Sequence, residues 1–147
     1  MKTSEPPVIV EHIFDVSIDT VWRAITIRNE MVQWFFDNIP DFKAETGFKT
    51  QFNVQAPSRD FMHLWLVEAV IPLEKLLVNW QYEGLNGSSN VTMELLGNNH
   101  QTHFKLTTEV LEDFDDAIPE FRRESCVGGW NYFIKDRLVQ YLSSKHE

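Results

Sequence analysis

The stretch that decides the fold is GGWNYFIKDRLVQYL, Gly128 to Leu142. Apolar residues recur in it at steps of three and four, which is the spacing of one broad stripe on an amphipathic helix. The stripe consists of Trp130, Ile134, Arg137 or Leu138, and Tyr141. We expect the helix to begin near Ser125 or as early as Pro119. A helix with so apolar a face needs another apolar surface to cover.

The middle of the chain supplies that surface, because its hydrophobic residues alternate with polar ones as they do in half-buried strands. Short links rich in turn formers, such as Gly97–His100, favour antiparallel neighbours, since parallel strands need a long crossover. Five such segments are predicted: 42–54, 61–71, 74–84, 89–97 and 100–110. Their inward rows include Phe48, Thr50 and Phe52 in the first of these segments, and Trp80 and Tyr82 in the third.

Before this sheet comes an opening unit of one strand and two short helices. Residues 6–18 are rich in branched apolar side chains and predict the first strand. Ser17 is a suitable N-cap for a helix over 18–26, and Asn29 is a suitable cap for a second helix over 30–36. The sequence therefore predicts an α+β fold: a curved antiparallel sheet of about six or seven strands wrapped around a long C-terminal helix, in one domain spanning 1–147.

Gly128 and Gly129 allow two interpretations. They let the helix backbone approach the sheet closely, or they mark a loop before the helix begins. The sequence favours neither.

The composition of the chain limits the classes of partner and the compartment that we expect. The formal net charge of −9 lacks the basic footprint of a phosphate-backbone binder, so nucleic acid is not expected. The single cysteine, Cys126, cannot form an internal disulfide, which fits a reducing compartment. No segment is typical of a signal peptide or a membrane span, and we expect a cytoplasmic protein without membrane insertion.

At this point the residues resemble a known family. The order of motifs is similar to the START-like, helix-grip (SRPBCC) superfamily, and within it to proteins related to the C-terminal domain of the activator of the heat-shock protein 90 ATPase. The matching positions are Ser17, Val21 and Trp22; Trp34; Pro72, Leu76 and Trp80; and Gly129 with Trp130. The lead into the second hairpin, KAETGFKT, keeps only one glycine of the family pattern. These motifs are mainly structural, so the resemblance speaks for the fold more than for the chemistry.

The resemblance implies a space between sheet and helix that holds apolar or amphipathic small molecules. The large inward-facing aromatic set permits two readings, an aromatic-walled cavity or a solid core. Polar residues in apolar rows are candidates for ligand contacts, since burying one without a partner costs on the order of 1–3 kcal/mol. The alternative is that His12 and the threonines are satisfied core residues and that Arg137 reaches solvent.

Twelve residues are the candidate ligand contacts: His12, Thr50, Phe52, His63, Trp65, Trp80, Tyr82, Phe104, Thr108, Trp130, Ile134 and Arg137. A structure that leaves His12 and Arg137 both outside any internal cavity would defeat this site proposal.

Other constellations predict little chemistry. His100 and His103 point to opposite faces of a strand, so we expect no zinc site, and no other metal or cofactor. The acidic run 112–116 indicates a solvated turn, and Ser88 and Ser89 belong to a turn without a nucleophile pattern. Phe35, Phe36 and Phe114 are possible exposed aromatics of a dimer patch.

Three functions remain open. The first is a protein that holds a small hydrophobic molecule. The second is an enzyme of the aromatase or cyclase kind using the same cavity, for which His12, His63, Tyr82 and Arg137 are the only candidate acid–base groups. The third is a chaperone contact, as the resemblance to the ATPase activator implies, although the fold begins so near Met1 that no preceding chaperone-binding domain is expected.

Overall fold

The computed structural model describes residues 1–145. The chain forms β1 (Val8–Phe14), α1 (Ile18–Thr26), α2 (Arg28–Trp34), β2 (Lys49–Gln55), β3 (Asp60–Ile71), β4 (Lys75–Tyr82), β5 (Ser88–Gly97) and β6 (Thr102–Glu112). A 3-10 turn, η1 (Pro119–Phe121), then leads into one helical rod made of α3 (Arg123–Asn131), a π-helical segment η2 (Tyr132–Leu138) and α4 (Val139–Ser143).

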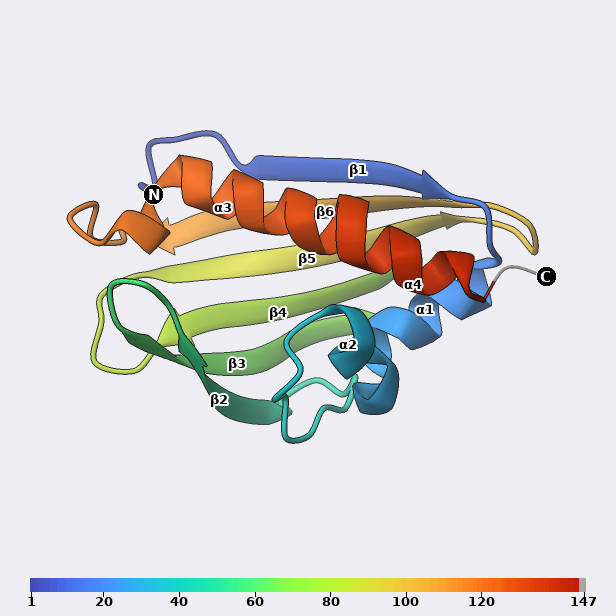
Figure 1. The fold of residues 1–147 in the computed structure, drawn as a ribbon, viewed down its shortest axis with the longest axis horizontal. Coiled ribbons are helices and arrows are strands. Elements are labelled where there is room, and N and C mark those ends of the chain that lie inside the picture. The colour runs from blue at the N-terminus through green and yellow to red at the C-terminus, as the bar shows by residue number, and fades with distance from the viewer. Residues whose placement is uncertain (146–147) are drawn as a thin grey trace.

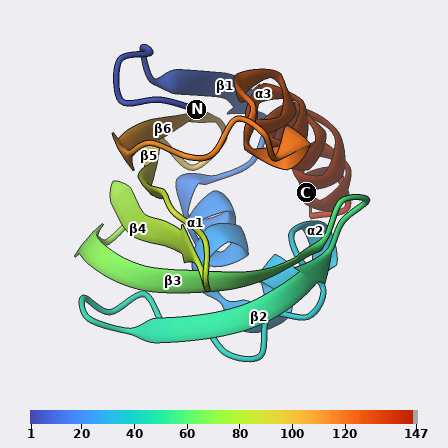
Figure 2. The same cartoon turned by 90° about the vertical axis from the view of Figure 1, so that its left-hand side faces the viewer.

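The six strands form one antiparallel sheet in the order β1-β6-β5-β4-β3-β2. The sheet curves, and the C-terminal rod lies across it on the concave side, next to β1 (Figures 1 and 2). The predicted α+β architecture of a curved antiparallel sheet around a long terminal helix is confirmed. The last two residues of the range 1–147 lie outside the described residues.

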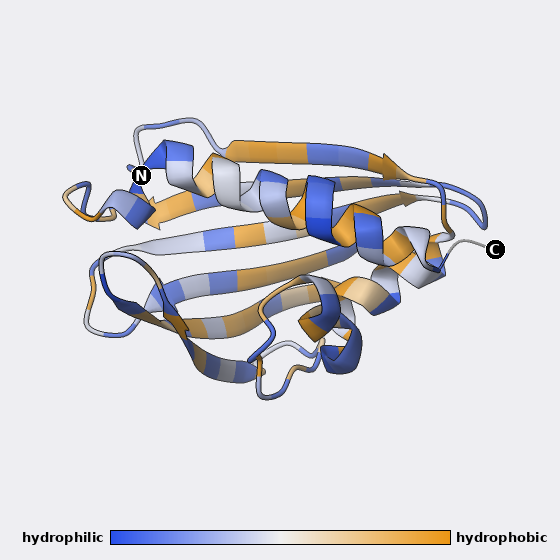
Figure 3. Ribbon diagram, viewed as in Figure 1, coloured by the Kyte–Doolittle hydropathy of each residue, from blue (hydrophilic) through white to orange (hydrophobic). Residues whose placement is uncertain are grey.

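Along the C-terminal rod, apolar and polar residues alternate in bands (Figure 3). Its buried row is Trp130, Ile134, Leu138 and Leu142, a strict spacing of four. That spacing drifts by about 40° per step around an ordinary α-helix. The wider i→i+5 winding of η2 counters the drift and keeps the row on the sheet. Leu138, not Arg137, therefore occupies the stripe.

Gly128 and Gly129 lie inside α3, and a Cβ added to either would meet nothing within 4 Å. Both interpretations from the sequence are wrong: the pair is neither a loop nor a close contact with the sheet.

The first helix has the predicted bounds, since the Ser17 hydroxyl accepts from the backbone N–H of Thr20. The prediction that Asn29 caps the second helix is wrong. Helix α2 begins at Arg28, and its N-cap, Ile27, makes no side-chain capping bond. Ile27 is a single extended residue whose own N–H still bonds to the carbonyl of Arg23, so the two helices follow each other without room for a separate cap.

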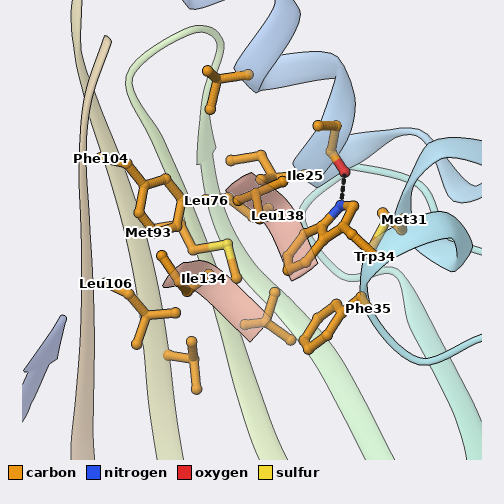
Figure 4. Close-up of a cluster of buried hydrophobic side chains, with 14 of the residues drawn as sticks. Ile25, Met31, Trp34, Phe35, Leu76, Met93, Phe104, Leu106, Ile134 and Leu138 are labelled. Carbon is orange, nitrogen blue, oxygen red and sulfur yellow. Dashed lines mark hydrogen bonds between the residues drawn. The ribbon is translucent and has the colours of Figure 1, made fainter. Parts of the chain in front are cut away.

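The main core lies between the sheet, α1, α2 and the C-terminal rod (Figure 4). Phe35 and Phe114 are buried at 4% and 2% exposure, and Phe36 packs against the core, so these three do not form an exposed patch. Phe35 stacks on Trp34 with 4.7 Å between ring centroids. Phe114 belongs to a second buried cluster with Phe61, Ile118 and Phe121, because the acidic segment after β6 folds back over the end of the sheet.

Candidate functional site

A cavity of about 170 Å³ lies between the sheet and α3. Its sheet wall comes from side chains of the inward rows of β3 to β6: His63, Trp80, Tyr82, Ser89 and Thr108. Its helix wall consists of Ser125, Cys126, Gly129, Trp130 and Phe133, which share one side of the C-terminal rod. Aromatic rings dominate both walls, with a few hydroxyl, imidazole and thiol groups among them.

The rim of the cavity is held by a contact between two distant segments. The hydroxyl and the backbone N–H of Ser58, in the link between β2 and β3, both donate to the carboxylate of Glu120 in η1, at 2.5 and 3.2 Å. Glu120, Phe121 and Phe114 line the same end of the cavity. The β2–β3 hairpin and the segment after β6 therefore meet where the cavity approaches the surface.

His63 lines this space and has one ring nitrogen free to accept a hydrogen bond. Its Nδ1 lies 3.1 Å from the carbonyl oxygen of Phe61, which can only accept, so Nδ1 carries the hydrogen. Nε2 then keeps its lone pair, and the described residues offer it no hydrogen bond. Burial lowers the pKa of His63 to about 4, so the ring is neutral near pH 7.

The other polar groups of the walls are also uncharged. Burial raises the pKa of Tyr82 above its usual range, and it raises the pKa of the Cys126 thiol to about 11. The hydroxyl of Thr108 is buried, at 3% exposure, without a hydrogen-bond partner among the described residues. The Thr108 hydroxyl neighbours the Cys126 thiol in the wall. This hydroxyl would stabilise the ionised form of the thiol. The sheet and helix walls are thus aromatic and neutral, with unused hydrogen-bonding capacity at His63 and Thr108, and the charged groups of the lining residues Met1 and Glu120 are paired with other parts of the chain.

The rest of the interior is filled. Toward α1 and α2 only a void of about 20 Å³ remains, lined by Trp34, Phe35, Trp65 and Trp80 among others. Phe35 lies 5.5 Å from Trp65 and 5.8 Å from Trp130, centroid to centroid. Each of the two interpretations of the aromatic residues is therefore right for one part of the molecule. The aromatic residues form a solid core near the short helices, and they form the walls of a cavity near η1.

The structure brings together five of the twelve candidate residues around the cavity: His63, Trp80, Tyr82, Thr108 and Trp130. Phe52 stands behind this wall and stacks on His63 at 5.1 Å with the planes 14° apart. Trp65, Phe104 and Ile134 are buried core residues outside the cavity wall. Thr50 is partly exposed on the edge strand β2, where it lines a surface groove with Lys49 and Gln51.

His12 and Arg137 lie outside the cavity, so the twelve residues do not form one site. His12 points inward, but it pairs with Phe104 at the filled end of the sheet and lines a shallow groove beside Val139 and Leu142. The guanidinium of Arg137 donates to the hydroxyl of Tyr132 and to the carbonyl of Gln33. A ligand site that includes these two residues is not supported by the geometry.

Several lining residues were missed from the sequence. Ser89 was predicted as the first residue of a strand and was assigned to the preceding turn as well, whereas β5 begins at Ser88 and both serines are buried. Ser89 lies two and four residues before Val91 and Met93, so the alternation of strand side chains already places it on the same inward face. Cys126 lies one four-residue step before Trp130, and extending the helical stripe backwards would have found it. Phe114 and Phe121 gave no local signal, because only the tertiary fold returns their segment to the sheet.

Two kinds of feature are absent from the part of the chain that the structure describes. Within it, no three His, Cys, Asp or Glu side chains come together in a way that would hold a metal ion. None of its helices is both long and apolar enough to span a bilayer.

Comparison with known proteins agrees with this architecture. Residues 15–143 match the model of the family described as Activator of Hsp90 ATPase homolog 1-like protein. The chain belongs to this family. The match covers strands β2 to β6, the short helices and the C-terminal rod, and it confirms the resemblance to the ATPase activator that the sequence motifs indicated.

Solved structures share the fold. DynU16, a protein of the dynemicin biosynthetic locus, superposes with a TM-score of 0.75 at 22% identity over 97% of this chain. The alignment covers 49% of DynU16, so the chain spans about half the length of that protein. MLL2253 from Mesorhizobium loti gives 0.74 at 25% identity, over 97% of this chain and all (100%) of that one. CalU16 from Micromonospora echinospora gives 0.62 at 18% identity, covering 92% of this chain and 73% of CalU16.

These likenesses place this member of the activator family in the START-like, helix-grip superfamily. No curated protein matches the chain significantly.

Proposed function

We propose that this member of the activator family binds a small, uncharged, largely apolar molecule in the cavity between the sheet and α3. The observation that carries the proposal is a space of about 170 Å³ walled by aromatic rings, into which His63 and Thr108 bring unused hydrogen-bonding groups. DynU16, which shares the fold, comes from a biosynthetic locus, a setting in which small organic molecules are handled. A cytoplasmic location belongs to the same proposal.

Binding is favoured over acid–base catalysis by the state of the titratable groups. A general acid or base works best with a pKa near the operating pH. The pKa of His63 lies far below 7, and those of Tyr82 and Cys126 lie far above it. His12 and Arg137, the other two candidates for an aromatase or cyclase, are outside the cavity. The walls are therefore suited to holding a molecule rather than moving its protons.

A chaperone contact is the second alternative, because the family description names an activator of the Hsp90 ATPase. It is tested by adding the protein to the chaperone in a coupled ATPase assay. Stimulation that persists when the cavity is blocked would favour a surface contact over the cavity as the seat of function.

The direct test of binding combines native mass spectrometry with thermal shifts. Protein purified under native conditions is examined for a copurifying small molecule, and a panel of aromatic, aliphatic and fatty-acid compounds is then added. A ligand at about a hundred times its Kd stabilises the fold by about 2.7 kcal/mol. No bound mass and no shift with any compound would end the proposal.

A pair of glycine variants makes the test specific to the cavity. Gly129 lies on the cavity side of α3, whereas Gly128 lies about 100° further round the helix and does not line the cavity. Gly129→Leu should weaken binding by at least about tenfold, and Gly128→Leu should leave it unchanged. Equal effects of the two variants would show that the ligand binds elsewhere.

A further inference from the structure

We infer that the molecule held in the cavity is an uncharged single-ring aromatic compound with a hydroxyl group, of the phenol class, and that this hydroxyl donates to Nε2 of His63. The inference rests on the proposed function and adds the chemical class of the ligand and its orientation.

The volume of the cavity matches about one ring. Ligand pockets for drug-sized molecules are about 300–1,000 Å³, well above the 170 Å³ found here. An apolar protein cavity of about 150 Å³ is known to accept benzene. The surrounding walls are rings as well: Trp80 and Trp130 meet with 5.4 Å between centroids and their planes at 63°. Edge-to-face packing of a ligand ring against such walls adds about 0.5–1.5 kcal/mol per pair beyond its buried area.

The hydrogen-bonding groups require a donor on that ring. The Phe61 carbonyl fixes the hydrogen of His63 on Nδ1, so the cavity-side nitrogen can only accept. A ligand carbonyl or ether would leave Nε2 unpaired, whereas a hydroxyl hydrogen satisfies it. Thr108 stands on β6, three strands away from His63 on β3, so its hydroxyl is a separate polar point of the wall.

The cavity offers no unpaired charge to an ionised ligand. Burying an unpaired carboxylate or ammonium costs far more than burying a hydroxyl. Two lining residues carry charge, and both charges are already paired: the N-terminal ammonium of Met1 donates to the Asp116 carboxylate and the Phe121 carbonyl, and the Glu120 carboxylate accepts from Ser58. A benzoate or a benzylamine would therefore be rejected, while a phenol, neutral near pH 7, is accepted.

Toluene and phenol make the test, because they are nearly isosteric and differ in a methyl versus a hydroxyl group. Their Kd values are measured by calorimetry and by protein NMR shifts, with benzoate as the charged comparison. In the wild-type protein both neutral compounds bind and benzoate does not. His63→Phe keeps a ring on Phe52 but removes the acceptor, so the ratio of the phenol Kd to the toluene Kd should rise about tenfold. Thr108→Val tests the other unpaired polar group of the wall, and His12→Phe, the same change at a histidine outside the cavity, should leave that ratio unchanged.

The controls separate the possible failures. Toluene binding to His63→Phe, or to a second variant His63→Leu, shows that the cavity is intact. If toluene binds but the phenol-to-toluene ratio is insensitive to both His63 variants, or changes with Thr108→Val instead, the assignment to His63 is overturned while the proposed function stands. Tight benzoate binding would overturn the uncharged class. If neither neutral ring binds and no compound of the wider panel does, the proposed function fails together with the inference.

Discussion

His63 and Tyr82 lie directly opposite each other on β3 and β4, and their rings meet nearly edge to face with 4.8 Å between centroids and 76° between planes. The pair forms one corner of the cavity, with Phe52 stacked on the other side of the imidazole. Burial favours the uncharged form of both side chains, by lowering the pKa of one and raising that of the other. The pair therefore makes stability depend on pH in a definite direction.

Acid should destabilise the fold through His63. The pKa of this residue is about 4 in the folded protein and 6.5 in a free chain, so between these values the unfolded state binds the proton that the folded state refuses. The stabilisation is complete above about pH 6.5 and is lost as the pH falls toward 4. The difference amounts to roughly 3 kcal/mol. Urea unfolding of wild type and His63→Phe should show wild type losing this much relative to the variant.

Comparing the two proteins cancels the other titrating groups, including His12, whose pKa is also lowered by burial. Free energies of unfolding that run parallel in the two proteins from about pH 7.5 to about pH 4 would contradict a neutral buried His63.

The thiol of Cys126 should react slowly with thiol reagents. Its pKa of about 11, against 9.0 for a free thiol, lowers the thiolate fraction near pH 8 by about a hundredfold. Ellman's reagent should therefore react at least about a hundredfold more slowly with the native protein than with the protein in urea. A ligand in the cavity covers the same sulfur and should slow the native reaction further. Equal rates in the native and unfolded states would show that the thiol is not buried in the cavity wall.

The two helix glycines should be replaceable by alanine with a gain in stability. In a helix interior glycine costs about 0.8–1.0 kcal/mol relative to alanine, and a Cβ at Gly128 or Gly129 meets no atom within 4 Å. Each of Gly128→Ala and Gly129→Ala should thus raise the free energy of unfolding by about 0.5–1 kcal/mol. A loss of stability in either variant would reveal a close contact of α3 that the structure does not contain.

Local patterns were sufficient to predict most of the fold and only part of the site. The bounds of α1 follow from Ser17, whose hydroxyl satisfies the first turn within three residues of chain. Alternation in each strand identified the correct faces, and His12 does lie in an inward row. Alternation does not say which end of a row meets a cavity, however. In the register of β1 and β6, Val8 pairs with Thr108 at the cavity and His12 with Phe104 at the filled end.

What fills that end is not a local property. Trp34 and Phe35 stack with their planes 3° apart, and together with Trp65 they occupy the space beneath the short helices. No spacing rule relates residue 35 to residue 65. The extent of the cavity therefore depends on ring packing between α2 and the sheet, which only the structure reveals.

Trp34 and Trp65 provide a matched pair for testing that packing. Both are buried, at 0% and 4% exposure, but their indole N–H groups differ. The N–H of Trp34 donates to the carbonyl of Ala24 at 2.8 Å, the bond drawn in Figure 4, and that carbonyl is one of the last four of α1, which have no partner within the helix. The N–H of Trp65 is buried without a partner among the described residues.

Substitution by phenylalanine removes the same atoms from each and leaves a similar void, so the packing losses are alike. Trp34→Phe also leaves the Ala24 carbonyl buried and unpaired, which costs about 1–3 kcal/mol, whereas Trp65→Phe removes a donor that was already unsatisfied. In urea unfolding, Trp34→Phe should therefore be less stable than Trp65→Phe by about 2 kcal/mol. Equal destabilisation would mean that the Trp65 N–H has a partner in solution, such as a water molecule in the 20 Å³ void beside it.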